Sequence, residues 1–410
     1  MQIVLVINCG SSSLKYQLLD MEKETLLVKG LVERIGLELG SHTYSRPGQD
    51  QLAWEQPVPD HLTAIEFLFS AFTDPQHGVV ADIQEIATVG HRVVHAGEKY
   101  ACSVKIDEDV LAALEECIPL APLHNPANLT GIKATQAAFA KRGVTDLPMV
   151  AVFDTAFHQT MPDRAYIYAL PYELYREDKI RRYGFHGTSH RYVTARCAEI
   201  LNRDPEELNL ISCHLGSGAS VAAVQGGKSI DTSMGFTPLQ GLMMGTRSGD
   251  IDPAIVGFLA RKMNNSLEAV ERVLNKKSGM LGISGISSDL RDVEREYARG
   301  NDRARLALEV YAYNIRKYIG AYAVALGKVH AIIFTAGVGE HASLVREWAC
   351  QGLEIFGAVL DPFKNATRHD EALISKESSR VKIMIIPTNE ELMIARDTKA
   401  LVLAGTPALK

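Results

Sequence analysis

Short apolar runs that end in small or polar turns recur along the chain, and this pattern does most to limit its fold. Such runs lie at residues 3–7, 150–153, 210–213, 331–334 and 382–386. Runs this short, bounded by turn residues, are typical of buried strands. Amphipathic patterns between them predict helices over residues 110–117, 127–142 and 303–326. The third helix is expected to place its apolar residues on one face, and these are Leu306, Val310, Ile315, Ile319 and Tyr322. Alternating strands and helices predict an α/β architecture.

Two distant segments follow one scheme. Residues 4–16 and 210–221 each pass from an apolar run through a Gly/Ser turn into a second run with alternating apolar residues. Each is interpreted as a β-hairpin with a small tip. Two such hairpins suggest two related domains, the second starting near residue 155. Two unrelated hairpins would give the same pattern, so the repeat alone leaves both readings open.

Bulk properties exclude several classes of protein. A chain of 410 residues suggests two or three domains. The net charge of −6 argues against a general nucleic-acid binder. The six scattered cysteines form no C-x-x-C pair and suit reduced thiols. No apolar run approaches the roughly 20 residues of a membrane span, and no signal peptide is evident. We therefore expect a cytoplasmic protein without membrane or nucleic-acid partners.

Glycine-rich turns are candidate phosphate sites. The turns at residues 10–13 and 216–218 would let backbone N–H groups approach a phosphate, with Lys15 adding charge to the first. Residues 337–342 fit G-x-G-x-x-A, and Asp361 follows about twenty residues on, where a ribose-binding acid is expected. A nicotinamide-dependent dehydrogenase is therefore a competing interpretation. Residues 226–229 lack the upstream glycine of a Walker A motif and predict a hairpin turn.

Arginines and acids at strand ends suggest anion and metal chemistry. Arg92 follows a strand-like stretch, and Arg247 lies in a glycine-rich loop with acids only downstream. Arginine offers paired donors to carboxylate and phosphate, although a surface ion pair is the alternative. Asp154 ends a strand, where a helix cap is the alternative role. Asn8 and Glu390 supply oxygens that suit a hydrated Mg²⁺.

Histidine pairs invite a zinc interpretation, which the spacing disfavours. His91 and His95 would lie too far apart on a strand, and His186 and His190 lack an H-E-x-x-H glutamate. His186 is expected in a loop before a helix capped by Thr188 or Ser189. A better role for His186 is a hydrogen-bond donor to a phosphoryl oxygen.

Six motifs in order along the chain closely resemble the acetate kinase family. They are NCGSSSLK (8–15), APLHNP (121–126), VFDTAFHQ (152–159), YGFHGTSH (183–190), MGTRSGD (244–250) and PTNEE (387–391). The resemblance implies two ribonuclease-H-like domains of the actin, Hsp70 and sugar kinase superfamily, with a cleft between them, in a homodimer. The N-terminal domain would hold residues 1–154 and 390–410, and the nucleotide-binding domain residues 155–389.

The same resemblance implies a transferase that moves the ATP γ-phosphate reversibly to acetate, giving acetyl phosphate and ADP with Mg²⁺ or Mn²⁺. It assigns residues to four roles. These are catalytic Arg92, Asp154, His186 and Arg247; substrate-binding Arg92, Val94, Leu123, Phe185 and Pro238; nucleotide-binding Lys15, His214, Gly216, Ser217, Gly218, Asp289, Leu290, Arg291, Gly337, Val338 and Gly339; and metal-binding Asn8 and Glu390. Replacing Arg92 or Arg247 by Ala is expected to abolish activity with normal folding.

Three positions depart from the family pattern, and two alternatives stay open. Ser217, Ala96 and His341 replace the usual Asn, Gly and Asn. A backbone that needs positive φ would strain Ala96. Val94 stands where similar propionate kinases tend to carry Ala, and the smaller pocket favours acetate. Propionate or butyrate kinase is one alternative. An Hsp70- or actin-like ATPase, which needs no carboxylate-binding arginine, is the other.

Overall fold

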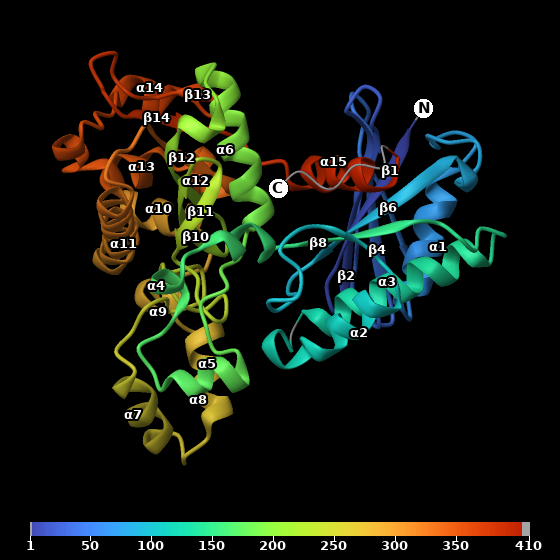
Figure 1. Ribbon diagram of the computed structural model, residues 1–410, viewed down its shortest axis with the longest axis horizontal. Coiled ribbons are helices and arrows are strands. Elements are labelled where there is room, and N and C mark those ends of the chain that lie inside the picture. The colour runs from blue at the N-terminus through green and yellow to red at the C-terminus, as the bar shows by residue number, and fades with distance from the viewer. Residues whose placement is uncertain (1, 123, 404–410) are drawn as a thin grey trace. The chain divides into compact units, whose positions relative to one another are not determined.

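The computed structural model describes residues 2–122 and 124–403, which form an α/β protein with two separate sheets (Figure 1). The chain divides into two compact units. One comprises the residues up to Ala156 together with the segment from Asn389, and the other is Phe157–Thr388. The predicted α/β class is confirmed. Leu123, expected to bind substrate, lies outside the described residues.

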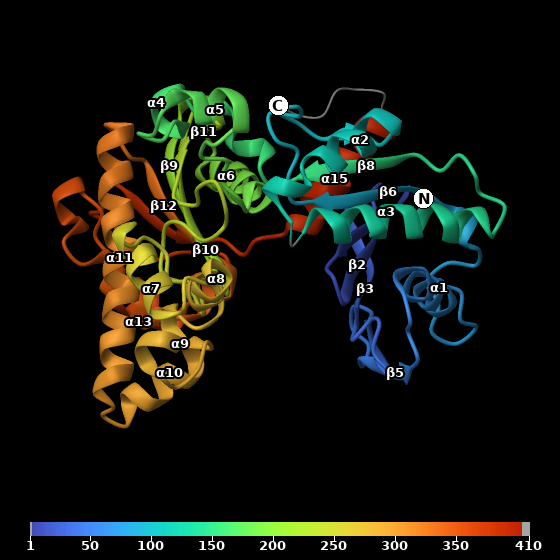
Figure 2. The ribbon, with the colours of Figure 1, turned by 90° about the horizontal axis from the view of Figure 1, so that it is seen from below.

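The first unit is built on a sheet of strand order β5-β4-β3-β2-β1-β6-β8-β7. Its strands are β1 (Ile3–Cys9), β2 (Ser13–Asp20), β3 (Thr25–Glu33), β4 (Gly40–Ser45), β5 (Leu52–Gln56), β6 (Ile86–Val93), β7 (Val104–Lys105) and β8 (Met149–Phe153). Strands β1 and β8 are buried almost throughout because helices cover both faces of the sheet. Figure 2 shows α3 (Asn125–Ala140) and α15 (Glu390–Val402) on opposite sides of β6, which both helices contact.

The second unit has a sheet of order β11-β10-β9-β12-β14-β13. Its strands are β9 (Asn209–Leu215), β10 (Ala219–Gln225), β11 (Lys228–Thr232), β12 (Ala331–Thr335), β13 (Ala372–Leu373) and β14 (Lys382–Ile385). Helices α6 (Gly187–Leu201) and α11 (Asp302–Leu326) pack against it from opposite sides (Figure 2).

The remaining helices are shorter than α11. They are α1 (His61–Phe72) and α2 (Glu108–Glu116) in the first unit, and in the second α4 (Asp163–Tyr166), α5 (Tyr172–Asp178), α7 (Ala254–Lys262), α8 (Leu267–Lys276), α9 (Gly279–Ser284), α10 (Leu290–Ala298), α12 (Ala336–His341), α13 (Ser343–Cys350) and α14 (Pro362–Thr367). Turns of 3₁₀ helix lie at Ile83–Glu85, Ile118–Leu120, Ala156–Thr160, Pro205–Glu207 and Leu353–Phe356.

Both sheets contain the same five-stranded arrangement. In β3-β2-β1-β6-β8 and in β11-β10-β9-β12-β14, three antiparallel strands precede two parallel ones. This is the ribonuclease-H-like topology, so the predicted fold class is confirmed, and the two hairpins occupy equivalent places in the two sheets. Their tips close differently: the N–H of Gly10 donates to Ser13 O, three residues on, at 2.8 Å, and that of Gly216 to Gly218 O, two residues on, at 3.0 Å.

The predicted helices exist as α2, α3 and α11, but two residues expected on the buried face of α11 are not in its core. Leu306 is 47% exposed and Val310 is half-buried, whereas Leu308 and Tyr311 are buried together with the predicted Ile315, Ile319 and Tyr322. The turn between β10 and β11 is the predicted hairpin, with positive φ at Gly226 and Gly227.

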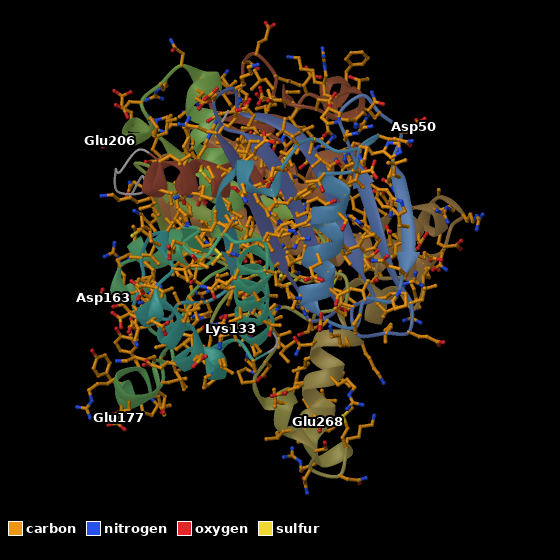
Figure 3. All side chains as sticks on the ribbon, turned by 90° about the vertical axis from the view of Figure 1, so that its right-hand side faces the viewer. Asp50, Lys133, Asp163, Glu177, Glu206 and Glu268 are labelled. Atoms are coloured by element: carbon orange, nitrogen blue, oxygen red, sulfur yellow. The ribbon has the colours of Figure 1, made fainter. Side chains whose placement is uncertain are left out.

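Ala96 is not among the residues with positive φ, so no such strain arises there. Exposed charged side chains include Lys133 in the first unit and Glu268 in the second, both labelled in Figure 3. In the described part of the chain, no helix is both long and apolar enough to cross a membrane.

Candidate active site

Arg92 and Asp154 form a buried ion pair at the end of the first sheet. The parallel register of β6 and β8 pairs Val93 with Phe153, and the N–H of Asp154 donates to Val93 O at 3.0 Å. Arg92 then donates through Nε to Oδ1 of Asp154 at 2.9 Å and through Nη2 to Oδ2 at 2.5 Å. The Asp154 side chain is only 3% exposed. Asp154 therefore orients Arg92, and the helix-cap alternative is wrong.

The charge of Arg92 is well compensated. Burial opposes it, but the carboxylates of Asp154 and Glu390 outweigh burial and raise the pKa of Arg92 above its usual value. The side chain is still 23% exposed, so the guanidinium can reach a ligand. A fixed, permanently charged fork is suited to a carboxylate or phosphate.

Asn8 and Glu390 bring oxygen atoms to the same end of this sheet. Asn8 is near the end of β1, and its Oδ1 accepts from Arg92 Nη1 at 3.4 Å. Glu390 opens α15, whose cap Asn389 accepts from the N–H of Leu392 at 3.0 Å. Within the described residues, the Glu390 carboxylate makes no hydrogen bond.

The electrostatics of Glu390 fit a bound cation. The pKa of Glu390 is raised to about 7, mainly by burial; Arg92 and Lys15 oppose the rise, and nearby Asp154 and Glu391 contribute to it. A bound cation would favour the ionised carboxylate. Mg²⁺ commonly takes one or two protein oxygens and completes its shell with water and phosphate oxygens. The described residues hold no group of three or more acids, histidines or cysteines that could bind a metal by themselves, so a sparse site of this kind is the one they fit.

Lys15 lies beside this site but has a partner. It faces Asn8 across the β1–β2 hairpin, and its Nζ forms an ion pair with Glu391. Its assignment to ATP stays a prediction.

In the second unit, His186 occupies a strained backbone position. It is the N-cap of α6 and has a left-handed φ of 58°, which is uncommon for a residue other than glycine. The predicted cap by Thr188 or Ser189 is wrong, since both lie inside the helix, which begins at Gly187. The His186 ring stacks on His214 with centroids 4.1 Å apart.

Arg247 approaches the same turn as His186. A Cβ atom placed on Gly218 would lie 3.4 Å from His186 Nε2 and 3.5 Å from Arg247 Nη1. Arg247 donates to Pro238 O at 3.3 Å, and no described carboxylate forms an ion pair with it. Burial lowers the pKa of Arg247. An arginine without an acidic partner, next to a histidine and a glycine turn, is a ready site for an anion.

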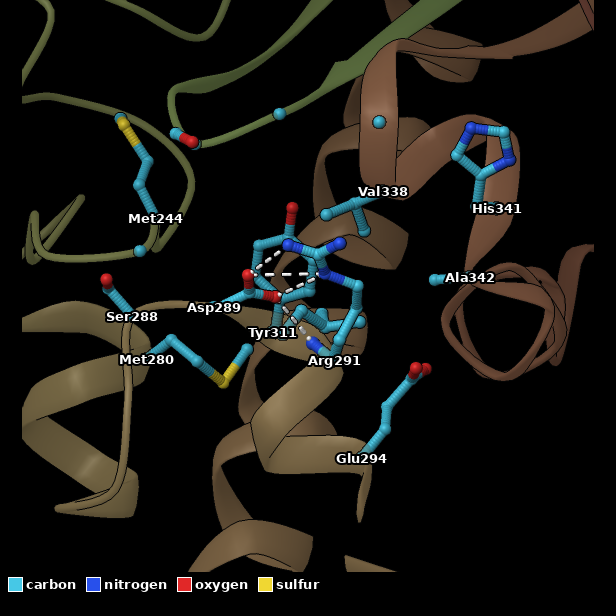
Figure 4. A pocket seen from close by; sticks show the side chains of 15 residues that line it. Met244, Met280, Ser288, Asp289, Arg291, Glu294, Tyr311, Val338, His341 and Ala342 are labelled. Atoms are coloured by element: carbon cyan, nitrogen blue, oxygen red, sulfur yellow. Dashed lines mark hydrogen bonds and ion pairs between the residues drawn. The ribbon is translucent and has the colours of Figure 1, made fainter. Parts of the chain in front are cut away.

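A pocket of about 400 Å³ lies beside this turn (Figure 4). Seven of the predicted nucleotide residues line it: Gly216, Ser217, Asp289, Leu290, Arg291, Gly337 and Val338. Arg291 is held by Asp289, with Nη2 at 2.6 Å from Oδ2. His341, which replaces the usual Asn, also lines the pocket.

Two predicted glycines have other surroundings. Gly339 does not line the pocket; it lies in α12, where a Cβ would come within 3.3 Å of the Phe334 carbonyl carbon. Gly218 lies at the turn shared by His186 and Arg247.

The dehydrogenase interpretation is wrong. Asp361 caps α14 by accepting from the N–H groups of Phe363 and Lys364. All but the last of residues 337–342 lie within helix α12. The acid expected for ribose is therefore engaged elsewhere.

Sequence reasoning missed several residues of the pocket wall. They are Met244, Gly245, Met280, Ser288, Glu294, Tyr311 and Ala342. The hydroxyl of Tyr311 is buried and has no hydrogen-bond partner among the described residues. Burial raises the pKa of Glu294. Glu294 follows Leu290 by one helical turn on α10, and that spacing is the signal that could have found it.

The residues expected around the acyl group are apolar and mostly covered. Val94 and Phe185 are buried, in the first and second unit respectively, and Pro238 is half-buried. Their contact with a substrate stays a prediction.

Comparison with known proteins agrees with this geometry. The chain matches the profile of the Acetokinase family over residues 3–396. It is 57% identical over 396 residues to an acetate kinase of Clostridium botulinum, covering 97% of this chain and 98% of that one. It is 58% identical over 400 residues to an acetate kinase of Caldanaerobacter subterraneus subsp. tengcongensis, with the same coverage.

Solved structures give the same result. The acetate kinase of Porphyromonas gingivalis superposes with a TM-score of 0.93 at 48% identity, covering 98% of this chain and all of that one. A propionate kinase of Francisella tularensis gives a TM-score of 0.90 at 41% identity, covering 97% and 99%. The chain therefore belongs to the acetokinase family.

Proposed function

We propose that this protein is an ATP-dependent acetate kinase that transfers the γ-phosphoryl group of ATP to acetate and, in reverse, from acetyl phosphate to ADP. The observation that carries the proposal is the pairing of Arg247 with His186 at the Gly218 turn, next to a nucleotide-sized pocket. An ATPase that transfers phosphate only to water has no need for an additional arginine dedicated to a carboxylate, and Arg92 offers one.

The chemistry needs charge compensation rather than a base. A carboxylate is already a nucleophile, and the barrier comes from bringing it to an anionic phosphoryl group. In this proposal Arg92, fixed by Asp154, binds the acyl carboxylate. Arg247 and His186 donate to the phosphoryl oxygens as negative charge gathers on them, and direct in-line transfer follows.

The nucleotide and metal roles complete the proposal. Adenosine would occupy the pocket walled by Asp289, Leu290 and Val338, with the Gly216–Gly218 turn at its phosphates. Asn8 and Glu390 would hold Mg²⁺ or Mn²⁺, which when bound neutralises phosphate charge. We also propose that the enzyme acts as a homodimer, which light scattering after gel filtration would test.

Acetate is the acyl substrate that we expect. The buried Val94 leaves less room than the Ala expected in propionate kinases, and one methylene is worth only about 1–3 kcal/mol in such a pocket. Propionate should therefore react, but more slowly. Propionate kinase is the second candidate because a propionate kinase structure matches this chain closely.

A coupled assay of ADP release tests these statements. ADP is measured with Mg-ATP and acetate, with propionate, and with no acceptor, each with and without a chelator. We expect acetate-dependent ADP, a lower kcat/KM with propionate and loss of turnover with the chelator. ADP release that is independent of any carboxylate would contradict a carboxylate kinase, and a higher kcat/KM for propionate would contradict acetate.

A further inference from the structure

Three buried side chains stand behind His186 in a continuous hydrogen-bonded array. Ser212 Oγ lies 2.9 Å from His190 Nδ1, His190 Nε2 lies 2.8 Å from Ser220 Oγ, and Ser220 Oγ lies 2.9 Å from His186 Nδ1. Ser212, His190 and Ser220 are all fully buried. We call these four side chains the histidine array.

The fold explains why these residues meet. His186 and His190 are one turn apart at the start of α6, which packs on β9. Ser212 on β9 pairs with Ala222, and Ser220 on β10 pairs with His214. Because alternate residues of a strand share a face, both serines lie on the same face of the sheet. The helix thus sets its two histidines against two serines on neighbouring strands.

The hydrogen bonds of the histidine array all run from donor to acceptor in one direction, from Ser212 toward His186. Burial and the nearby His158 and His214 hold the pKa of His190 well below its usual value, so its ring is neutral and carries one N–H. One of its two serine bonds is therefore donated and the other accepted. In the part of the chain that the structure describes, the Ser212 hydroxyl has one partner, His190 Nδ1. A buried hydroxyl hydrogen needs an acceptor, so Ser212 donates to Nδ1.

The rest of the array follows from that first bond. The His190 proton must lie on Nε2, which donates to Ser220 Oγ, and the Ser220 hydroxyl then donates to His186 Nδ1. A neutral His186 accepts at Nδ1 and so carries its proton on Nε2. That nitrogen is the one that approaches the Gly218 turn, where Arg247 Nη1 also lies.

We propose that Ser212, His190 and Ser220 are positioning residues that hold His186 as the Nε2–H tautomer, so that a neutral imidazole donates a hydrogen bond to the transferring phosphoryl group. No proton is transferred in this arrangement; the array only selects which nitrogen bears it. The inference rests on the proposed role of His186 in the kinase reaction.

The test combines nitrogen NMR with kinetics on the full-length protein and its Ser220→Ala variant. Histidine labelled with ¹⁵N distinguishes a protonated ring nitrogen from an unprotonated one, and a His186→Asn variant identifies the His186 signals. In the wild type we expect Nε2 protonated and Nδ1 bare. In Ser220→Ala we expect a mixture of tautomers.

Turnover should follow the tautomer. We expect kcat of Ser220→Ala to fall by between about tenfold and a hundredfold, less than the about 10²–10³-fold cost of deleting one such donor. The KM for ATP should stay near the wild-type value, because the pocket does not include Ser220. Ser220→Thr, which keeps the hydroxyl, should restore both the tautomer and kcat.

A matched control loses a similar bond elsewhere. Ser379 is buried in the same unit, and its Oγ donates to Val381 O at 2.6 Å and accepts from the N–H of Val359 at 2.8 Å. Ser379→Ala should leave the His186 signals and kcat unchanged. If Ser220→Ala fails to fold, Ser212→Ala tests the far end of the array, where we expect the same mixture of tautomers.

Two results would overturn the inference: a wild-type His186 protonated on Nδ1, or a Ser220→Ala protein with unchanged tautomer and kcat. Absence of acetate-dependent ADP release in the wild type would instead contradict the proposed function. The NMR measurement needs no turnover, so the two failures are distinguishable.

Discussion

The two arginines proposed to bind anions differ in what holds them. Arg92 is held by both oxygens of the buried Asp154, whereas the hydrogen bonds of the Arg247 side chain within the described residues go to Pro238 O and, at 3.8 Å, Met244 Sδ. Removing one partner of a buried ion pair leaves the other charge uncompensated, which costs about 3–5 kcal/mol. Removing Arg247 leaves no such charge. Stability and activity should therefore separate at these two positions.

We predict that Arg247→Ala loses about 10³–10⁵-fold in turnover with an unchanged melting temperature. Arg92→Ala should lose turnover and also have a lower melting temperature, which revises the expectation of normal folding drawn from sequence. The coupled assay and thermal unfolding measure both effects. The double variant Arg92→Ala/Asp154→Asn is the control: it should recover stability but not activity. Equal melting temperatures for the two single variants would contradict this account.

Acyl selectivity can be tested at Val94. We predict that Val94→Ala raises the ratio of kcat/KM for propionate over acetate by about tenfold, because a larger pocket admits the extra methylene. The neighbouring Val93 is also fully buried but belongs to the core of the first unit, so Val93→Ala is a matched control and should leave the ratio unchanged. An unchanged ratio in Val94→Ala would remove this residue from the acyl site.

At the scale of elements, helix α12 shows how one motif serves two purposes. Gly337 lines the nucleotide pocket, and a Cβ there would meet nothing within 4 Å. Gly339 faces β12, and the fully buried Arg346 holds the end of α12 by donating to the carbonyl oxygens of Gly339 and Glu340. Gly337 thus borders the pocket, and Gly339 allows α12 to pack closely on β12.

We predict that Gly337→Ala affects ATP binding and that Gly339→Ala affects stability. Gly337→Ala should keep the melting temperature and raise the KM for ATP, because its methyl group enters the pocket. Gly339→Ala should lower stability by about 1–3 kcal/mol through overpacking. Thermal unfolding and ATP titration of both variants test this pair. A Gly339→Ala protein as stable as the wild type would contradict the prediction, because it would show that α12 can shift away from β12 at little cost in free energy.

At the scale of the whole molecule, buried histidines make stability depend on pH. Burial lowers the pKa of His42 and His158 to about 4 and that of His91 to about 3, from an ordinary value of 6.5. Below pH 6.5 the unfolded chain binds protons that the folded chain does not, so stability falls as the pH falls toward 4. Glu390 acts oppositely, because its pKa is raised from 4.5 to about 7 in the folded chain. The folded chain therefore binds a proton that the unfolded chain does not, and this group adds stability as the pH falls from about 7 to 4.5.

We predict that His158→Gln loses less stability on acidification than the wild type. Glutamine can still donate to Phe185 O and accept from Ser229, the two partners of His158, but it does not titrate. The difference in unfolding free energy between pH 6.5 and 4 should shrink by up to about 3 kcal/mol. The exposed His369 supplies the control, since His369→Gln should leave the dependence unchanged. Equal slopes for the wild type and His158→Gln would refute the assignment.

The division of the chain into two units depends on packing between segments far apart in sequence. Helix α15 follows the second unit in sequence but packs on β1, β6 and β8 of the first. The motif at residues 387–391 led to the same expectation through the family resemblance. The boundaries at 154 and 390 stay a prediction of the functional domains.

The sequence by itself determined the central strands of both sheets, the glycine turns, about half of the pocket wall and the family. Apolar runs, turn residues and contiguous motifs are local signals, and they carry this information without tertiary contacts. The hairpins at Gly10 and Gly216 and the residues Asp289–Arg291 are examples.

Only the tertiary structure decided which side chains meet and which are buried. The partnership of Arg92 with Asp154 depends on the parallel register of β6 and β8, and the surroundings of Glu390 depend on where α15 packs. The direction of the hydrogen bonds in the histidine array depends on His190 Nδ1 being the one partner of the Ser212 hydroxyl among the residues described. Registers, burial and hydrogen-bond direction arise between segments far apart in the chain, so no local pattern specifies them.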